Sequence, residues 1–181
     1  MLLTDDNKLQ VILGCINQER KAQEQLYKSF YVAMMSLCQR FTKNEQDALS
    51  ILNNGFLKVF RNIAKYESEK ASLYTWIRTI VLNTCLDFIK LSKSDFTTTE
   101  IDNDIEFNIQ PAVIEKYNSE EILAHIRTLP TATKAVFNLY VIEGYNHKEI
   151  GTILNISEGT SKWHLSDARK KLQLILNTTT I

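Results

Sequence analysis

The sequence predicts an all-α protein made of two helical domains joined by a flexible acidic linker. Three observations support this fold class. Only 5 glycines and 2 prolines occur in 181 residues, which leaves little material for tight turns and disfavours a hairpin-rich β fold. Apolar residues recur at spacings of three and four along most of the chain. Hydrophobic residues make up 44% of it, which is enough to build packed cores.

The first predicted domain spans residues 1–92 and contains three helical stretches. Residues 5–40 are predicted to form one or two helices, because their apolar residues lie three or four positions apart. Asn44 is predicted to cap a helix over residues 46–64, and Ser72 is predicted to cap the helix after it. The polar residues between these two helices predict a loop.

Residues 93–117 are predicted to be a flexible linker, since they are rich in small polar and acidic residues and lack helical periodicity. The alternation of Ile105, Phe107 and Ile109 leaves a short strand as an alternative.

The second predicted domain spans residues 118–176. Asn118 is predicted to cap its first helix, which Pro130 limits. Residues 131–143 are predicted to form the next helix. Two helical domains of ordinary size therefore account for most of the chain.

Residues 144–176 predict a helix-turn-helix. Asn146, with Glu149 three positions later, predicts a capping box at the start of a short helix, and Ser157 is predicted to cap a longer basic helix. Gly151 is predicted to allow the two helices to approach closely. This arrangement is typical of motifs whose second helix enters the major groove of DNA. The alternative is an ordinary helical hairpin with a solvated basic face.

One side of that second helix carries groups that can contact DNA. Lys162 can donate to guanine O6 or N7, Ser166 can donate or accept, and Trp163 offers apolar contact. Basic residues further along suit phosphates, as do the free amides of the first helical turn. The predicted contacts are Gly159, Thr160, Lys162, Trp163, His164, Ser166, Arg169 and Lys170. For His164, a contact with protein instead of DNA stays open as an alternative.

The net charge of the chain is zero, which taken alone argues against a nucleic-acid binder. The charges are unevenly distributed, however. Residues 56–93 hold seven bases and three acids, residues 94–128 hold two bases and eight acids, and residues 129–181 hold six bases and four acids. Two basic regions therefore flank an acidic one, and the second basic region contains the helix-turn-helix.

Other function classes lack their sequence signals. Cys15, Cys38 and Cys85 lie far apart in helix-like stretches, which predicts buried thiols and no metal or redox site. There is no Ser/His/Asp constellation, phosphate-binding glycine loop or metal-ligand cluster, so we expect no enzyme, catalytic residue, metal or cofactor. The start lacks the pattern of a signal peptide, and no run approaches the roughly 18 apolar residues of a membrane span. A cytoplasmic protein without membrane insertion is expected.

The run from Ile156 to Leu172 closely resembles the promoter −35 recognition helix of the σ70 family, specifically that of the bacterial extracytoplasmic-function (ECF) sigma factors. Residues 47–60 look like the core-polymerase-binding helix of this family, and residues 73–90 look like its −10 element helix. The resemblance implies a σ2-like bundle and a σ4-like helix-turn-helix domain. It also implies binding to the β′ clamp helices and β flap of core RNA polymerase and to −10/−35 promoter DNA.

The resemblance also implies roles for individual residues. The loop of residues 65–72 corresponds to the segment that captures an unstacked −10 base, on which Tyr66 is expected to stack. Residues implied in −10 binding are Lys65, Tyr66, Arg78, Asn83, Asp87 and Lys90, whereas Trp76 is expected to have mainly a core role. Residues implied in polymerase binding are Asp47, Leu52, Asn53, Asn54, Phe56 and Lys58. Family members are commonly held inactive by an anti-sigma factor, which the resemblance adds as a partner class.

Two departures from the family pattern affect the expected affinities. Asn53 and Asn54 stand where the family usually has Gln-Glu or Gln-Asp, which predicts weaker polymerase binding. Asp167 stands where the family often has Arg, which predicts one phosphate contact fewer. Two alternatives to a sigma factor stay open: a stand-alone helix-turn-helix regulator, and a sigma-like protein that acts only through protein partners. The departures argue for the second of these.

Overall fold

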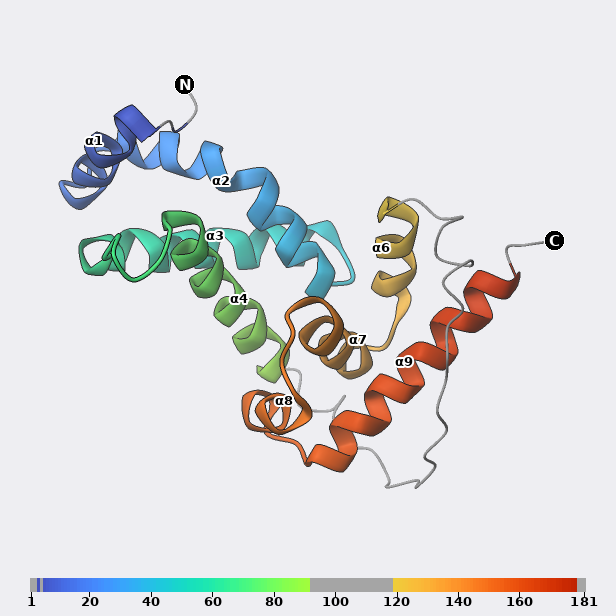
Figure 1. Ribbon diagram of the computed structural model, residues 1–181. Helices are drawn as coiled ribbons and strands as arrows, with labels where there is room; N and C mark the ends of the chain where they lie inside the picture. The colour runs from blue at the N-terminus through green and yellow to red at the C-terminus, as the bar shows by residue number, and fades with distance from the viewer. Residues whose placement is uncertain (1–2, 4, 92–118, 179–181) are drawn as a thin grey trace. The chain divides into compact units, whose positions relative to one another are not determined.

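The computed structural model describes residue 3 and residues 5–91 and 119–178. Within these residues it contains helices and no strand, which confirms the all-α fold class (Figure 1). The predicted linker over residues 93–117, the alternative strand within it and the predicted cap Asn118 lie outside the described residues.

The chain divides into two compact units, which are described separately. The N-terminal unit comprises the residues up to Gln39 together with Asn44–Asp87, and the C-terminal unit comprises Arg40–Lys43 and the residues from Phe88 onward. The expected domain limits of 1–92 and 118–176 stay a prediction.

In the N-terminal half of the chain, the helical caps lie where the sequence predicts them. Asn44 Oδ1 accepts a hydrogen bond from the Asp47 amide at 2.8 Å, and Ser72 Oγ accepts one from the Thr75 amide at 3.1 Å. The region over residues 5–40 is two helices rather than one. The elements are α1 (Asp5–Ile16), α2 (Arg20–Phe41), α3 (Glu45–Asn62), the 3-10 turn η1 (Ile63–Lys65) and α4 (Leu73–Leu91).

The N-terminal unit has its core where α2, α3 and α4 meet. A Cβ atom at Gly55 of α3 would lie 3.1 Å from Val81 Cγ2 of α4, so these two helices approach closely at that point. Cys15, Cys38 and Cys85 are buried and carry thiols rather than a disulfide, which confirms the prediction of buried thiols. Burial raises the pKa of the Cys15 thiol to about 11, so this group stays protonated and unreactive.

The C-terminal unit packs its last helix against its first two. Ile126 and Leu129 form a buried cluster with Ala168 and Leu172 of the last helix. The predicted helix over residues 131–143 begins as an α-helix and continues as a π-helical turn. The elements are α6 (Ser119–Thr128), α7 (Thr131–Phe137), the π-helical turn η3 (Asn138–Ile142), α8 (His147–Leu154) and α9 (Glu158–Thr178).

Candidate nucleic-acid interface

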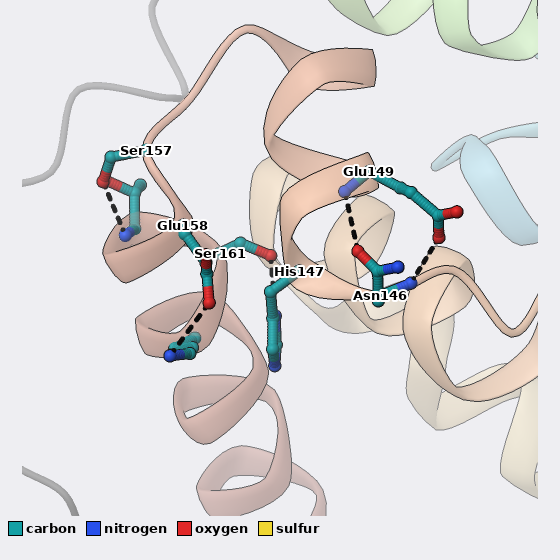
Figure 2. A network of polar contacts seen from close by, with 8 residues as sticks. Asn146, His147, Glu149, Ser157, Glu158 and Ser161 are labelled. Carbon is teal, nitrogen blue, oxygen red and sulfur yellow. Dashed lines mark hydrogen bonds and ion pairs between the residues drawn. The ribbon is translucent and has the colours of Figure 1, made fainter.

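Helix α8 begins with the reciprocal capping box that the sequence predicts. Asn146 Oδ1 accepts from the Glu149 amide at 2.9 Å, and Glu149 Oε2 accepts from the Asn146 amide at 2.8 Å (Figure 2). Two amides at the helix start are thereby satisfied within the first turn. The cap fixes where α8 starts, and so where the turn after it falls.

The turn between α8 and α9 depends on two residues. Asn155 ends α8 in the left-handed conformation with φ 56°, which asparagine tolerates better than most residues. A Cβ atom at Gly151 would lie 2.9 Å from the carbonyl oxygen of Ile156, so the turn folds back closely over α8. The sequence predicted a close approach at Gly151 but not the conformation of Asn155.

Helix α9 starts with a cap and an ion pair, both visible in Figure 2. Ser157 Oγ accepts from the Thr160 amide at 2.9 Å, as predicted. Glu158 and Lys162, one turn apart, form an exposed ion pair of 3.0 Å. The hydrogen bond from Lys162 lowers the pKa of the Glu158 carboxyl, so this residue is ionised at neutral pH.

His147 of α8 connects the two helices of the motif. Its Nδ1 lies 2.9 Å from Ser161 Oγ of α9 (Figure 2). Its ring also stacks on that of Tyr140, with 4.5 Å between the ring centroids. Burial lowers the pKa of His147, and the neighbouring Lys162 and Arg169 lower it further. A neutral imidazole therefore holds α9 at a fixed angle to α8.

His164 lies inside the C-terminal unit, which agrees with its alternative contact with protein and contradicts the one with DNA. Its side chain is 2% exposed, and Nδ1 lies 3.0 Å from Thr133 Oγ1 of α7. Burial lowers the pKa of His164 to about 4, although the nearby Asp167 opposes the shift. The residue acts in packing because α7, distant in sequence, covers that side of α9.

Asp167 belongs to the same network of hydrogen bonds as His164 and Thr133. Thr133 Oγ1 donates to Asp167 Oδ2 at 3.0 Å, so the threonine oxygen accepts from the Nδ1–H of a neutral His164. Lys171 forms an ion pair with the same carboxylate oxygen. Through its hydrogen bond with Thr133, Asp167 therefore links α9 to α7. This internal role is a feature that the sequence could not reveal.

The other residues predicted on α9 differ in their exposure. The hydroxyl oxygen of Ser166 is buried, which contradicts its predicted contact with a base. Trp163 is half-buried, with its ring 4.9 Å from that of His164. The predicted residues that reach the surface fully or in part are Gly159, Thr160, Lys162, Trp163, Arg169 and Lys170.

A pocket of about 350 Å³ lies in the N-terminal unit, where α3, η1 and α4 converge. Lys65 and Asn83, both predicted from the resemblance to bind the −10 element, lie together in its lining. Trp76 also lines the pocket, in addition to its expected packing role. The sequence did not single out Asn62 and Ile80. The full lining is Lys58, Asn62, Lys65, Trp76, Ile80 and Asn83.

Tyr66 lies beside the pocket with both ends of its side chain engaged. Its hydroxyl donates to the Ala71 carbonyl at 3.1 Å, and its ring centroid lies 5.6 Å from that of Trp76. The tyrosine therefore orders the loop after η1 and places a second aromatic ring next to Trp76. Stacking of a base directly on Tyr66 stays a prediction.

Asp87 and Lys58 form an ion pair of 2.9 Å between α4 and α3. This contact places Lys58, predicted to bind polymerase, among the residues predicted to bind DNA. Lys90 lies one turn beyond Asp87 and is exposed, while Arg78 is not part of the pocket lining. Of the predicted −10 residues, Asn83 and Asp87 lie one turn apart on α4, while Lys65 and Tyr66 belong to η1 and the loop after it.

Leu52 and Phe56 belong to the core, so their predicted place on a polymerase-binding surface was wrong. They are 0% and 1% exposed. The exposed leucines of α3 are Leu49 at 40% and Leu57 at 51%. The spacing of apolar residues predicted a helix here but did not tell the buried leucines from the exposed ones.

The remaining predicted polymerase residues lie at or near the surface. Asn53 and Asn54 are exposed, and Asn53 Oδ1 accepts a hydrogen bond of 2.9 Å from the Tyr27 hydroxyl of α2. Asp47 is half-buried and accepts from the Asn44 side chain at 2.8 Å. The middle of this α3 surface is therefore uncharged and includes an aromatic residue of α2.

Comparison with known proteins matches both halves of the chain. Sigma-70 region 2 matches residues 26–94, and Sigma-70, region 4 matches residues 119–172. The chain belongs to the ECF group of the σ70 family. As a sigma factor it binds RNA polymerase and promoter DNA and directs transcription initiation. Sigma factors are non-enzymatic initiation factors.

Several known sigma factors are similar to this one over most of its length. The ECF RNA polymerase sigma factor SigM of Bacillus subtilis (strain 168) is 22% identical over 156 residues, covering 85% of this chain and 94% of that protein. The RNA polymerase sigma-H factor of Pseudomonas aeruginosa is 21% identical over 188 residues, covering 97% and 96%. A solved structure of the sigma factor RpoE in complex with the anti-sigma factor NepR from Bartonella quintana has 16% identity and a TM-score of 0.49, covering 85% and 96%.

Within the two described stretches, no group of three or more His, Cys, Asp or Glu side chains is placed to hold a metal ion. No helix described there is both long enough and apolar enough to cross a membrane.

Proposed function

We propose that the two units of this sigma factor divide promoter recognition between them. The N-terminal pocket takes an unstacked base of the −10 element, and α9 enters the major groove at the −35 element. The exposed face of α3 binds the β′ clamp helices of polymerase. The observation that carries this proposal is the pocket, because it brings Lys65 and Asn83 together with the indole of Trp76.

The chemistry of the pocket lining suits a nucleobase with its phosphate. Amide groups such as those of Asn62 and Asn83 can pair with the edge of a base, and the indole of Trp76 offers a surface for stacking. The amines of Lys58 and Lys65 suit the backbone phosphate. A pocket can accept a base only after the base leaves the duplex, which supports a role for this site at the melted part of the promoter.

Helix α9 suits an intact duplex instead. Lys162, Arg169 and Lys170 lie on its accessible side, while Asp167 and His164 are turned inward. A helix whose outer side is basic and whose inner side chains are held by hydrogen bonds fits the major groove without a change in conformation. The inward position of Asp167 supports the expectation that this helix makes fewer phosphate contacts than one with Arg there.

The polymerase-binding face of α3 is proposed to act mainly through neutral contacts. Leu49, Asn53, Asn54 and Leu57 supply apolar area and amides. We therefore expect polymerase binding to depend only weakly on salt. If the lack of an acidic residue at this place weakens binding to core polymerase, replacing Asn53-Asn54 with Gln-Glu should tighten that binding.

Run-off transcription with purified core polymerase tests the division of labour. The full chain is expected to give a start-site-specific transcript that depends on both promoter elements. Replacing the −10 sequence should abolish strand opening, whereas replacing the −35 sequence should weaken recruitment of the closed complex. Transcription that ignores both replacements would contradict the proposal.

The remaining expectations follow from this role. A protein that works with polymerase and DNA is proposed to act in the bacterial cytoplasm and to carry no catalytic activity of its own. The limits 1–92, 93–117 and 118–176 are proposed as the σ2-like domain, linker and σ4-like domain. Inhibition by an anti-sigma factor stays a prediction from the family resemblance.

A further inference from the structure

The start of α9 carries an acidic side chain whose role the proposed function leaves open. Glu158 is the first residue of the helix, and its side chain is 53% exposed. Its Oε1 lies 3.0 Å from Nζ of Lys162, one turn along the same side of the helix. An acceptor and a donor therefore stand side by side at the end of α9 that is expected to meet base edges.

Ordinary helix chemistry explains part of this arrangement. An acid in the first turn interacts favourably with the helix dipole, and a glutamate four residues before a lysine stabilises a helix. The exposed pair Glu24–Lys28 of α2, at 2.6 Å, has the same spacing and no predicted DNA nearby. On α9, however, the carboxylate faces a polyanion, so it opposes binding unless a base offers it a donor.

The major groove narrows the choice of that base. An ionised carboxylate only accepts hydrogen bonds, whereas guanine presents acceptors and thymine presents an acceptor and a methyl group. Adenine offers a donor but places the N7 acceptor next to it. Cytosine presents its N4 amino group alone, which makes it the complementary base for a glutamate.

We propose that Glu158 is a specificity-determining residue that accepts a hydrogen bond from the N4 amino group of a cytosine in the −35 element. The cytosine lies at or beside the base pair whose guanine Lys162 contacts. This inference rests on the proposed function of α9 as the −35 reader.

The geometry of the free protein suits such a contact. In a G·C pair, guanine O6 and cytosine N4 are hydrogen-bonded to each other, so they lie about 3 Å apart at the floor of the groove. The Glu158–Lys162 pair presents an acceptor and a donor 3.0 Å apart. Because the ion pair already holds the two side chains together, little further ordering is needed when the pair meets the base edges.

A promoter library tests the inference with the full chain bound to core polymerase. Each −35 position is randomised, and the bound or transcribed sequences are counted. The native protein is expected to prefer cytosine at one position. Glu158→Ala should remove that preference, so that the ratio of binding to cytosine over the other bases at this position falls by roughly tenfold. Glu158→Gln should shift it from cytosine to adenine, because a glutamine amide pairs with adenine N6 and N7. The matched control is Glu24→Gln, which breaks the equivalent ion pair on α2 and should leave the library profile unchanged.

Two outcomes overturn this inference. If Glu158→Gln keeps the native base preference at every −35 position, the carboxylate only supports Lys162 or the helix. If Glu158→Ala raises or lowers binding to all sequences equally, it acts through charge alone. Failure of the wider proposal looks different, because the native holoenzyme itself would then show no base preference anywhere in the −35 region.

Discussion

The pocket of the N-terminal unit and helix α9 of the C-terminal unit are both basic regions, yet they arrange their polar groups differently. On α9, side chains are tied to one another: Glu158 to Lys162, and His164 and Asp167 to Thr133. In the pocket, Lys65 and Asn83 expose their side chains around an open space.

This difference matches two kinds of DNA. A helix whose inner polar groups are already paired keeps one shape, which suits the regular groove of a duplex. An open pocket to which Lys65 and Asn83 present an amine and an amide suits a ligand that enters it, as an extruded base does. The contrast therefore comes from hydrogen bonding within each unit rather than from total charge.

The largest predicted effect concerns α3, whose buried side supports the pocket. Leu52→Ala should lower the free energy of unfolding by about 2–5 kcal/mol, because it leaves a cavity at a fully buried site. Leu49→Ala on the exposed side should change it by less than about 0.5 kcal/mol. Chemical denaturation of both variants measures this. Equal losses would mean that the two sides of α3 have been assigned wrongly.

The next effect tests how firmly the inner side of α9 is packed. The pKa of His164 is about 4 in the folded protein, against 6.5 for an unperturbed histidine. Below pH 6.5 the unfolded chain therefore binds a proton that the folded chain does not. The free energy of unfolding should fall, by on the order of 2 kcal/mol, between pH 7 and pH 5.

Denaturation at several pH values, with variants, isolates this contribution. His164→Gln should reduce the fall in the free energy of unfolding between pH 7 and pH 5, and the fall that remains includes the contribution of His147, whose pKa is also lowered. Identical pH profiles for the native protein and His164→Gln would show that this imidazole is not held neutral by burial.

The pocket itself is tested by Asn83→Ala. Loss of one amide contact to a captured base should slow formation of the open complex by about tenfold. A fluorescent base in the −10 element, observed with holoenzyme, reports the opening. The control Thr79→Ala changes an exposed residue of α4 outside the pocket lining. If both variants opened promoters at the native rate, the pocket would have no part in base capture.

The smallest effect concerns the tie between α7 and α9. Thr133→Val keeps the shape of the side chain but removes the hydroxyl that links His164 and Asp167. We expect a loss of about 1 kcal/mol in the free energy of unfolding. Thr152→Val, an exposed position on α8, is the control and should cost less than about 0.5 kcal/mol. A Thr133→Val variant as stable as the native protein would show that the hydrogen bonds of Thr133 with His164 and Asp167 do not stabilise the packing of α9.

Local features were predictable from the sequence because neighbours in the chain decide them. The caps at Asn44, Ser72, Asn146 and Ser157 each involve residues three positions apart, and all four are present. The left-handed Asn155 is also local, and an asparagine at the end of a helix was a signal that could have predicted it.

Features that depend on distant segments were not predictable. Periodicity placed Leu52 and Phe56 on one side of a helix, but α2 and α4 decide that this side is the core. The inward turn of His164 and Asp167 depends on Thr133, more than thirty residues earlier. The pocket combines α3, η1 and α4, so nothing in the sequence linked Asn62 or Ile80 to this site.

Site-specific crosslinking tests the division of labour most directly. A photoreactive residue replaces Ile80 in the pocket or Lys162 on α9, and each full-length variant is assembled with core polymerase on a promoter. We predict that position 80 crosslinks to a base of the −10 element only after strand opening, and that position 162 crosslinks to the −35 duplex before and after opening. Crosslinks from position 80 to polymerase alone, or to double-stranded DNA, would contradict this account.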